Sequence, residues 1–503
     1  MASSQTGYDQ PSSSNRSLLK NRIVHIGCGA FFRAHQALVL EKLNQMLPSD
    51  WGYTAVSLFS GMPFIQELRN QDHRYTVVEQ DHNTVNVQTV ESIIDSMHPS
   101  LDGIDAIINR MAEPQVSIIS LTITEKGYCV DPNTRQFHAT HPLIAQDIAT
   151  PKTPKSALGV IVAALSLRKE RGLPALSVMS CDNMPHNGEV TKAAIVAYAK
   201  LIDPELAEWI SAHISFPSTM VDRIVPATTD ESLQNIESLA GKFDPCGLMT
   251  EPFLQWVIED NFVSGRPQWE KIEGVSLVKD VQPYEEMKLR MLNGSHSFLA
   301  YTGFLSGYEY ISDTMADPNF KEMTRRLMLD EQKPTLQELD DINLVDYSEL
   351  LLNRFSNPYL KHKTAQIATD GSQKLPQRII ESIGILAKEE QSFAALALAT
   401  AAWMRYLKGV DENNQPINII DPLSEHLLSI ANQYSTADSM IKALLSEESI
   451  FDQSIVQQQP VIDAITRAYV NIEQKGAKKA SWKLLFSQHV LLMMSFAIYS
   501  PPI

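Results

Sequence analysis

The sequence predicts an α/β domain followed by a mainly α-helical domain. In the first half of the chain, short apolar segments alternate with helical patterns, which is typical of a parallel sheet covered on both faces by helices. After about Pro283, long helical patterns dominate and β-branched runs become few. The 503 residues are also too many for one ordinary hydrophobic core, so two domains are expected.

The spacing of apolar residues predicts the individual elements. In the first domain we expect strands at 23–26, 53–58, 75–79, 85–90, 116–123 and 176–180, with a hairpin around His82 and Asn83, and helices at 33–43 and 156–171. In the second domain, helical patterns cover 284–305, 320–329, 348–355, 377–388, 392–408, 423–434 and 438–446. Residues 1–20 are expected to be a disordered tail, and the domain boundary is placed between 283 and 284.

The acidic composition bears on the partners of the protein. The chain has 42 Lys and Arg against 59 Asp and Glu, a formal net charge of −17. An acidic protein repels phosphate backbones, so nucleic acid is not expected as a partner. A small anionic substrate is not excluded, because a local pocket can be basic on an acidic protein. The sequence does not indicate an oligomeric state.

The four cysteines and the two chain ends point to a cytoplasmic protein. No two cysteines form a C-x-x-C pair, which argues against a structural zinc site and for a reducing compartment. The polar, Ser-rich N-terminus has no apolar signal segment. The apolar run 490–499 is too short to span a bilayer, and we expect a buried terminal helix there.

A glycine turn after the first strand is the candidate cofactor loop. Gly27 can take the tight turn, and Gly29 lets backbone amides approach a pyrophosphate at a helix N-terminus. The third glycine of the usual fingerprint is replaced by Phe32, and the first acidic residue after the second strand is only Glu67. These residues therefore do not decide between NAD and NADP. The candidate contacts are Ile26, Gly27, Cys28, Gly29, Ala30, Phe31, Phe32 and Arg33.

The helix that begins near Pro283 carries the candidate catalytic residues. At about 100° per residue, Asn293 lies about 140° and His296 about 80° from Lys288, so the three polar groups share one side. Gly294 is expected to leave room for a ligand near the backbone. Oxidation of a secondary alcohol without a metal requires a base such as Lys288, and carboxamide N–H groups can stabilise the oxyanion. The alternative is a solvated lysine on a partly exposed helix.

Two further polar clusters support a site in this protein. Asn183 follows the strand 176–180, at the carboxyl end where open α/β sheets bind ligands, and is a second candidate oxyanion donor. The alternative is that Asp182 and Asn183 only cap the next helix. Asp222 and Arg223 either line the cofactor site or form a structural ion pair.

At these residues the sequence resembles the mannitol dehydrogenase family of polyol-specific long-chain dehydrogenases. The similar segments include GCGAFFRAHQA, SLTITEKGYC, SCDNMPHNG, FPSTMVDRIVPAT and KLRMLNGSHSFLAY, and they cover most of the chain. IVHIGCGAF, TEKGYC, KLRMLNGSHSFLAY and DGSQKLPQR are most similar to members that interconvert D-fructuronate and D-mannonate. The resemblance implies a Rossmann-type NAD-binding domain at 21–283 and a helical substrate and catalytic domain at 284–503.

The resemblance also implies a role for single residues. Lys288 corresponds to the catalytic lysine of the family, Asn183 and Asn293 to its oxyanion donors and His296 to its histidine. Glu285 corresponds to a glutamate proposed to gate proton exchange beside the base. The implied reaction is reversible hydride transfer between NADH and the keto group of D-fructuronate, in hexuronate breakdown and without a metal.

The substrate carboxylate needs a cation, for which Lys374, Arg378 and Lys363 are the candidates. Arg290 lies about 200° around the helix from Lys288 and is expected to face elsewhere. Gln366 stands where mannitol-specific members carry an arginine, which suggests a substrate other than mannitol. Activity on mannitol and fructose, or on another polyol or uronate, remains the nearest alternative. A nucleotide-binding regulator without catalysis is the alternative from another class.

Overall fold

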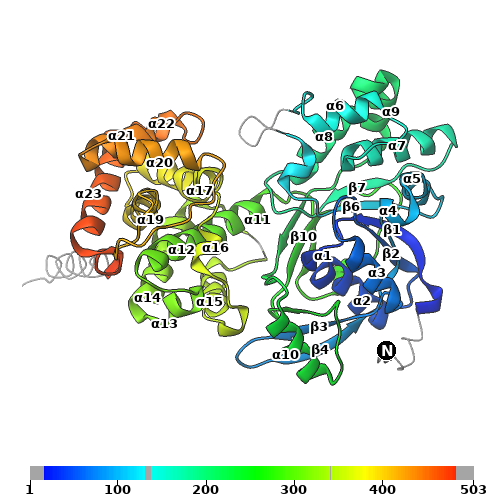
Figure 1. Ribbon diagram of the computed structural model, residues 1–503, viewed down its shortest axis with the longest axis horizontal. Helices are drawn as coiled ribbons and strands as arrows, with labels where there is room; N and C mark the ends of the chain where they lie inside the picture. The colour runs from blue at the N-terminus through cyan, green and yellow to red at the C-terminus, as the bar shows by residue number, and fades with distance from the viewer. Residues whose placement is uncertain (1–15, 131–136, 340, 483–503) are drawn as a thin grey trace, which may run out of the picture. The chain divides into compact units, whose positions relative to one another are not determined.

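The computed structural model describes residues 16–130, 137–339 and 341–482, and it divides into two compact units, Met1–Gln282 and Pro283–Ile503 (Figure 1). Most of the expected tail and the whole apolar run 490–499 lie outside the described residues. Across the part that is described, no helix combines the length and the apolar character that crossing a membrane requires.

The first unit is built on a five-stranded parallel sheet, which confirms the α/β prediction. Its strand order is β5-β2-β1-β6-β7, and every neighbouring pair is parallel. The strands are β1 (Lys20–Ile26), β2 (Trp51–Val56), β5 (Ile93–Met97), β6 (Ile118–Leu121) and β7 (Ser177–Ser180). The order reverses at β1, so the carboxyl ends of β1 and β6 border the position where such sheets bind ligands.

Helices cover both faces of this sheet because its strands are apolar on both sides. Val24, Ile119 and Val178 belong to one buried cluster, and Ile23 and Ile118 to another. The first cluster includes residues of α5 (Ile104–Met111), α7 (Ala157–Glu170), α8 (Asn187–Ile202) and α9 (Pro204–His213), and the second includes residues of α1 (Ala30–Ala34), α2 (Gln36–Met46) and α3 (Met62–Asn70). Successive residues along a strand therefore pack into different clusters on the two faces of the sheet.

Two smaller sheets complete the first unit. The predicted hairpin is confirmed as β3 (Tyr75–Gln80) paired with β4 (Val85–Val90), but it lies outside the main sheet and pairs with β9 (Leu248–Thr250). The other sheet has the order β11-β10-β8, with β8 (Thr219–Asp222), β10 (Gln255–Glu259) and β11 (Val275–Val278).

Residues 16–20, which were expected to belong to the disordered tail, have a defined structure. Residues Arg16–Leu18 form a 3₁₀ turn, and β1 begins at Lys20. The Arg16 guanidinium donates a hydrogen bond to the backbone oxygen of Asp72, at 2.5 Å. This contact ties the turn to the residues after α3, so residues 16–20 are part of the fold.

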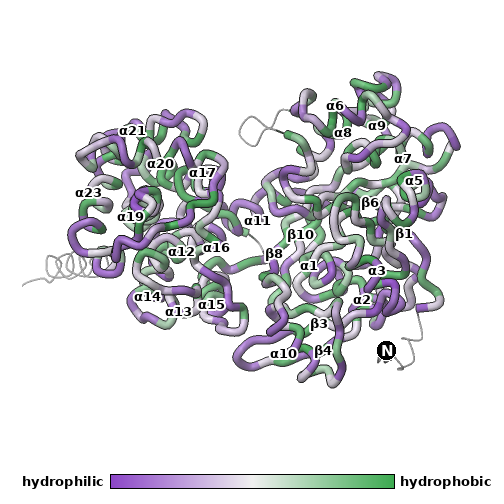
Figure 2. Tube along the Cα trace, viewed as in Figure 1, coloured by the Kyte–Doolittle hydropathy of each residue, from purple (hydrophilic) through white to green (hydrophobic). Residues whose placement is uncertain are grey.

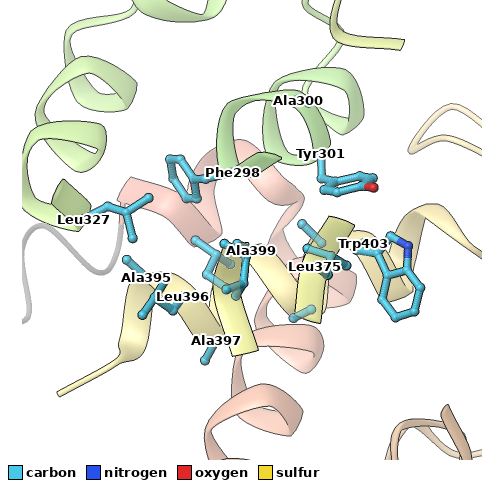
Figure 3. Packing of buried hydrophobic residues seen from close by; sticks show 14 of the residues in the cluster. Phe298, Ala300, Tyr301, Leu327, Leu375, Ala395, Leu396, Ala397, Ala399 and Trp403 are labelled. Atoms are coloured by element: carbon cyan, nitrogen blue, oxygen red, sulfur yellow. The ribbon is translucent and has the colours of Figure 1, made fainter. Parts of the chain in front are cut away.

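The second unit is helical, as predicted, and surrounds the buried helix α19 (Ala394–Tyr406). Figure 3 shows Phe298 and Tyr301 of α12 (Ser295–Leu305) beside Leu396, Ala399 and Trp403 of α19. The other long helices are α15 (Leu344–Phe355), α18 (Glu381–Lys388), α20 (Ser424–Gln433), α21 (Ala437–Leu445) and α23 (Gln459–Lys475). Along α23, which was not predicted, hydrophobic and hydrophilic residues alternate at helical spacing (Figure 2).

A buried arginine connects three segments of the first unit. Arg168 of α7 is fully buried and donates to the backbone oxygens of Met111, Glu113 and Pro174, at 3.3, 2.8 and 2.6 Å. Met111 and Glu113 lie at and just after the end of α5, and Pro174 lies before β7. The Arg168 side chain therefore connects α7 with both of these segments. A cation is also favourable at the C-terminus of a helix.

We expect Arg168→Met to destabilise the protein by about 2 kcal/mol or more, because it leaves buried carbonyl groups without donors. Arg171→Met is the matched control, since Arg171 lies one turn further along, is exposed and donates to Asn109. Urea unfolding of both variants measures the difference. Equal losses would contradict this role for Arg168.

Candidate active site

A π-helical segment carries the predicted catalytic residues. The chain runs as one helix through α11 (Gln282–Met287), the π-helix η4 (Lys288–Gly294) and α12. In a π-helix, hydrogen bonds join residues five apart, and Lys288 and Asn293 have this spacing. The angle between their side chains around the helix axis is therefore smaller than the angle of about 140° expected for an α-helix.

The candidate catalytic side chains are buried. The exposed fraction is 6% for Lys288, Asn293 and Glu285 and 7% for His296. A solvated lysine on an exposed helix face does not fit these values. Within the described part of the chain, the side-chain nitrogen of Asn293 is buried without a hydrogen-bond partner. A buried carboxamide N–H with unused capacity is suited to an oxygen of a ligand.

His296 is surrounded by aromatic and cationic side chains. Its ring centroid lies 4.5 Å from that of Phe355 and 5.3 Å from that of His362. Burial lowers the pKa of His296 well below its usual value, and His362, Arg354, Arg378 and Lys288 lower it further. The imidazole is therefore neutral, with one nitrogen as donor and one as acceptor.

The three candidate cations for a substrate carboxylate have different surroundings. Arg378 lies close enough to His296 to affect its pKa, and its guanidinium donates to the Ser297 hydroxyl at 3.3 Å. The ammonium of Lys374 is held by the backbone oxygen of Thr369 at 2.6 Å. Lys363 is exposed and forms an ion pair with Glu309 at 3.0 Å. Arg378 lowers the pKa of His296, whereas Lys374 lowers that of the neighbouring His362.

Two other residues of this helix have packing roles. Arg290 donates to the backbone oxygen of Thr335 at 2.5 Å and pairs with Glu286 at 3.4 Å, so it faces elsewhere, as predicted. The expectation that Gly294 leaves room for a ligand was wrong. A Cβ atom there would lie 2.7 Å from the Gln332 side chain and 2.8 Å from the Arg378 backbone oxygen. Gly294 instead allows neighbouring segments to pack closely.

The glycine turn has the geometry that a cofactor loop requires. Gly27 has φ +111°, and a Cβ atom there would lie 2.0 Å from the Thr122 backbone oxygen, so only glycine fits. A Cβ atom on Gly29 would find its nearest neighbour at 4.0 Å, which leaves its surface open. Phe32, in place of the third glycine, is buried and stacks on His25 with ring centroids 3.6 Å apart.

Two arginines near this loop have structural partners. Arg33 is buried, donates to the backbone oxygen of Cys246 at 2.5 Å and lies over the ring of Phe64. The Arg223 guanidinium donates to the Glu79 carboxylate and forms a buried ion pair with it. The cofactor-site role of Asp222 stays a prediction. Asp222, at the end of β8, is buried.

The polar residues after β7 do not cap the following helix. The N-cap of α8 is His186, and the side chain of Asp182 instead accepts hydrogen bonds from the Ile123 and Thr124 amides. Capping, the simpler alternative for Asp182, was therefore wrong. Asn183, the next residue, is exposed.

Sequence reasoning missed Phe355, His362 and Arg354 as neighbours of His296. They come from α15 and the segment after it, about 60 residues along the chain, and no local pattern connects them with the catalytic helix. As for metal ligands, the described residues include no group of three or more His, Cys, Asp or Glu side chains placed to hold an ion.

Comparison with known proteins gives this site a family. Residues 21–271 match the model for the mannitol dehydrogenase Rossmann domain, and residues 280–473 match that for the mannitol dehydrogenase C-terminal domain. The chain belongs to the mannitol dehydrogenase family. The family resemblance noted in the sequence is thus confirmed, and the chain is an oxidoreductase.

Three relatives illustrate the range of the family. D-mannonate oxidoreductase of Escherichia coli (strain K12) is 48% identical over 467 residues, with 92% of this chain and 96% of its own covered. The uncharacterized oxidoreductase YeiQ of the same strain is 50% identical, with 93% and 95% covered. The structure of Pseudomonas fluorescens mannitol 2-dehydrogenase with NAD and D-mannitol has a TM-score of 0.84 and 40% identity, with 93% and 95% covered.

We expect the buried imidazoles to make the second unit less stable as the pH falls from about 6.5 towards 4. Burial lowers the pKa of His362 to about 4, whereas an unfolded histidine titrates near 6.5. Between these values the unfolded chain binds more protons, so stability is lost with falling pH. For His362→Gln we expect a smaller slope of the free energy of unfolding against pH, measured by urea unfolding at several pH values. The decrease corresponds to up to one fewer proton taken up on unfolding.

His426→Gln is the control for a histidine substitution as such, because His426 is exposed in the same unit. If wild type and His362→Gln lose stability in parallel over this range, His362 is not held neutral by the fold.

Proposed function

We propose that this protein is an NAD-dependent D-mannonate oxidoreductase, which transfers hydride reversibly between NADH and the keto group of D-fructuronate. The observation that carries the proposal is the buried group of Lys288, Asn293 and His296, with Arg378 close enough to lower the pKa of His296. The group combines a proton donor, an amide donor for an oxyanion and a cation for a carboxylate.

The residues of the first unit fit a dinucleotide. The turn at Gly27 closes against Thr122, while the open surface of Gly29 precedes the first amides of α1. A diphosphate accepts hydrogen bonds from such amides. Bound NADH supplies the hydride of the reaction. Because the first acidic residue after β2 is Glu67, NADP stays a second candidate cofactor.

The side chains of the second unit supply the proton and the electrostatic stabilisation. In the direction of ketone reduction, the Lys288 ammonium donates its proton to the oxygen on which charge develops, and in the reverse direction its amine accepts that proton. The Asn293 amide donates a hydrogen bond to the same oxygen. The neutral imidazole of His296 orients the hydroxyl by a hydrogen bond. Asn183 is proposed as a second amide donor and Glu285 as the proton relay beside the lysine.

Arg378 is the candidate that best suits a substrate carboxylate. A guanidinium presents two parallel N–H groups to a carboxylate, and Arg378 is the member of the three predicted cations with an electrostatic effect on His296. The 48% identity with a D-mannonate oxidoreductase supports a sugar acid. The similarity to mannitol 2-dehydrogenase makes fructose reduction the second candidate.

The substrate class is tested by steady-state reduction of D-fructuronate and D-fructose with NADH and with NADPH. We expect kcat/KM to be higher for fructuronate. Arg378→Leu should lower kcat/KM for fructuronate by about 10- to 100-fold, because a charge-assisted pair contributes about 1.5–3 kcal/mol, and should change that for fructose little. Equal or better turnover of fructose by the wild type would instead identify a mannitol 2-dehydrogenase.

The proton donor is tested by Lys288→Ala. We expect kcat to fall by about 10²- to 10⁴-fold, the usual contribution of a general acid or base, while the affinity for NADH is kept. Rapid-mixing turnover and NADH fluorescence titration measure the two quantities. Lys442→Ala, at an exposed lysine of the same unit, is the control. Near-normal turnover of Lys288→Ala at neutral pH would exclude the proposed role.

A further inference from the structure

A buried carboxylate joins two loops at the carboxyl edge of the main sheet. Asp182, just after β7, is 8% exposed. Its two oxygens accept hydrogen bonds from the Ile123 amide at 3.0 Å, the Thr124 amide at 2.8 Å and the Tyr128 hydroxyl at 2.7 Å. These three donors belong to the segment that follows β6, the strand beside β7 in the sheet. Asp182 therefore fixes the segment after one strand to the segment after the next.

The segment after β6 is held in a strained conformation. Thr124 has φ +63° and ψ +161°, a region that is almost restricted to glycine. For a β-branched residue this conformation is a marked outlier, and it persists only when surrounding contacts enforce it. The hydrogen bond from the Thr124 amide to Asp182 is one such contact. Strain of this kind is concentrated at functional sites.

The opposite side of the same loop is fixed by Asn187. Its side-chain nitrogen donates to the backbone oxygens of Asp182 at 3.1 Å and Thr219 at 2.7 Å, and its oxygen accepts from the Thr219 amide at 2.9 Å. Asn187 is fully buried. The peptide between Asp182 and Asn183 is thus anchored from both sides, although Asn183 itself is exposed.

We propose that Asp182 is a positioning residue. Its carboxylate locks the segment 122–128 to the loop 181–187, and this lock sets the position of the carboxamide in the Asn183 side chain. The inference rests on the proposed function in one respect, namely the role of Asn183 as an oxyanion donor. A carboxylate is required because it accepts three hydrogen bonds. An asparagine in its place has one acceptor oxygen, and its NH₂ group would oppose an amide N–H.

The ionisation of Asp182 gives a second readout. The pKa of this carboxyl is raised to about 6, because burial and the Glu125 charge raise it more than the hydrogen bonds from Tyr128, Ile123 and Thr124 lower it. The neighbouring thiol of Cys181 is buried and neutral, since its pKa is raised as well. Below about pH 6 one oxygen of Asp182 carries a proton and can no longer accept from an amide. The lock therefore weakens as the pH falls through that value.

The test compares Asp182→Asn with Asp147→Asn. Asp147 is a fully buried aspartate of the same unit that accepts from the Lys155 and Ser156 amides, both at 2.8 Å, and we assign it no part in the site. For the Asp182 variant we expect kcat per folded molecule to fall at least tenfold, with the Kd for NADH changed less than threefold. For the Asp147 variant we expect a loss of stability with kcat unchanged. The acidic limb of the kcat profile near pH 6 should disappear only in Asp182→Asn.

Hydrogen exchange of the Ile123 and Thr124 amides tests the lock without turnover. We expect at least tenfold faster exchange in Asp182→Asn than in wild type or Asp147→Asn. If Asp182→Asn does not fold, Tyr128→Phe, which removes one of the three donors, is expected to give smaller changes in the same direction. Unchanged exchange, or a kcat within twofold of wild type, overturns the inference. A wild type that reduces neither fructuronate nor fructose overturns the proposed function instead, and the exchange rates then decide on the lock alone.

Discussion

The hydrogen-bonding pattern of η4 is the constraint on which the arrangement of the candidate catalytic residues depends. Bonds between residues five apart, rather than four, widen the helix and bring Lys288 and Asn293 towards one line. The same segment contacts two further π-helical segments, η5 (Leu327–Gln332) and η8 (Pro376–Ile380). The absence of a side chain at Gly294 permits this approach, because Gln332 and the Arg378 backbone occupy the space. If η4 were α-helical, the side chains of Lys288 and Asn293 would be separated by about 140° around the helix axis.

Burial of the His296 imidazole beside several cations determines its charge state. Lys288, Arg354 and Arg378 all act to keep a proton off His296, in addition to its burial. A protonated imidazole there would add a further unsolvated charge to a region that is already positive. Because the ring stays neutral, it keeps one nitrogen that can accept a hydrogen bond from a hydroxyl group.

The sequence predicts the elements that have strong local signals. The turn at Gly27, the hairpin of β3 and β4 and the long helix around Lys288 all follow from turn residues and apolar spacing. The π-helix could not be predicted in this way, because the argument assumed an α-helical period. The partner of Asp182 and the neighbours of His296 were missed for another reason. These contacts join segments about 60 residues apart, and only the tertiary structure brings them together.

The interruption of the helix at His35 has a consequence for the electric field at the glycine turn. The helix that follows the turn, α1, spans only Ala30–Ala34, and the chain leaves helical geometry at His35 before α2 begins. The peptide groups of α1 and α2 therefore belong to two separate helices. An anion at the turn would be held by the nearest peptide groups and would gain little from the eleven residues of α2. Changes in the charge of α2 should accordingly have little influence on the affinity of this loop for phosphate.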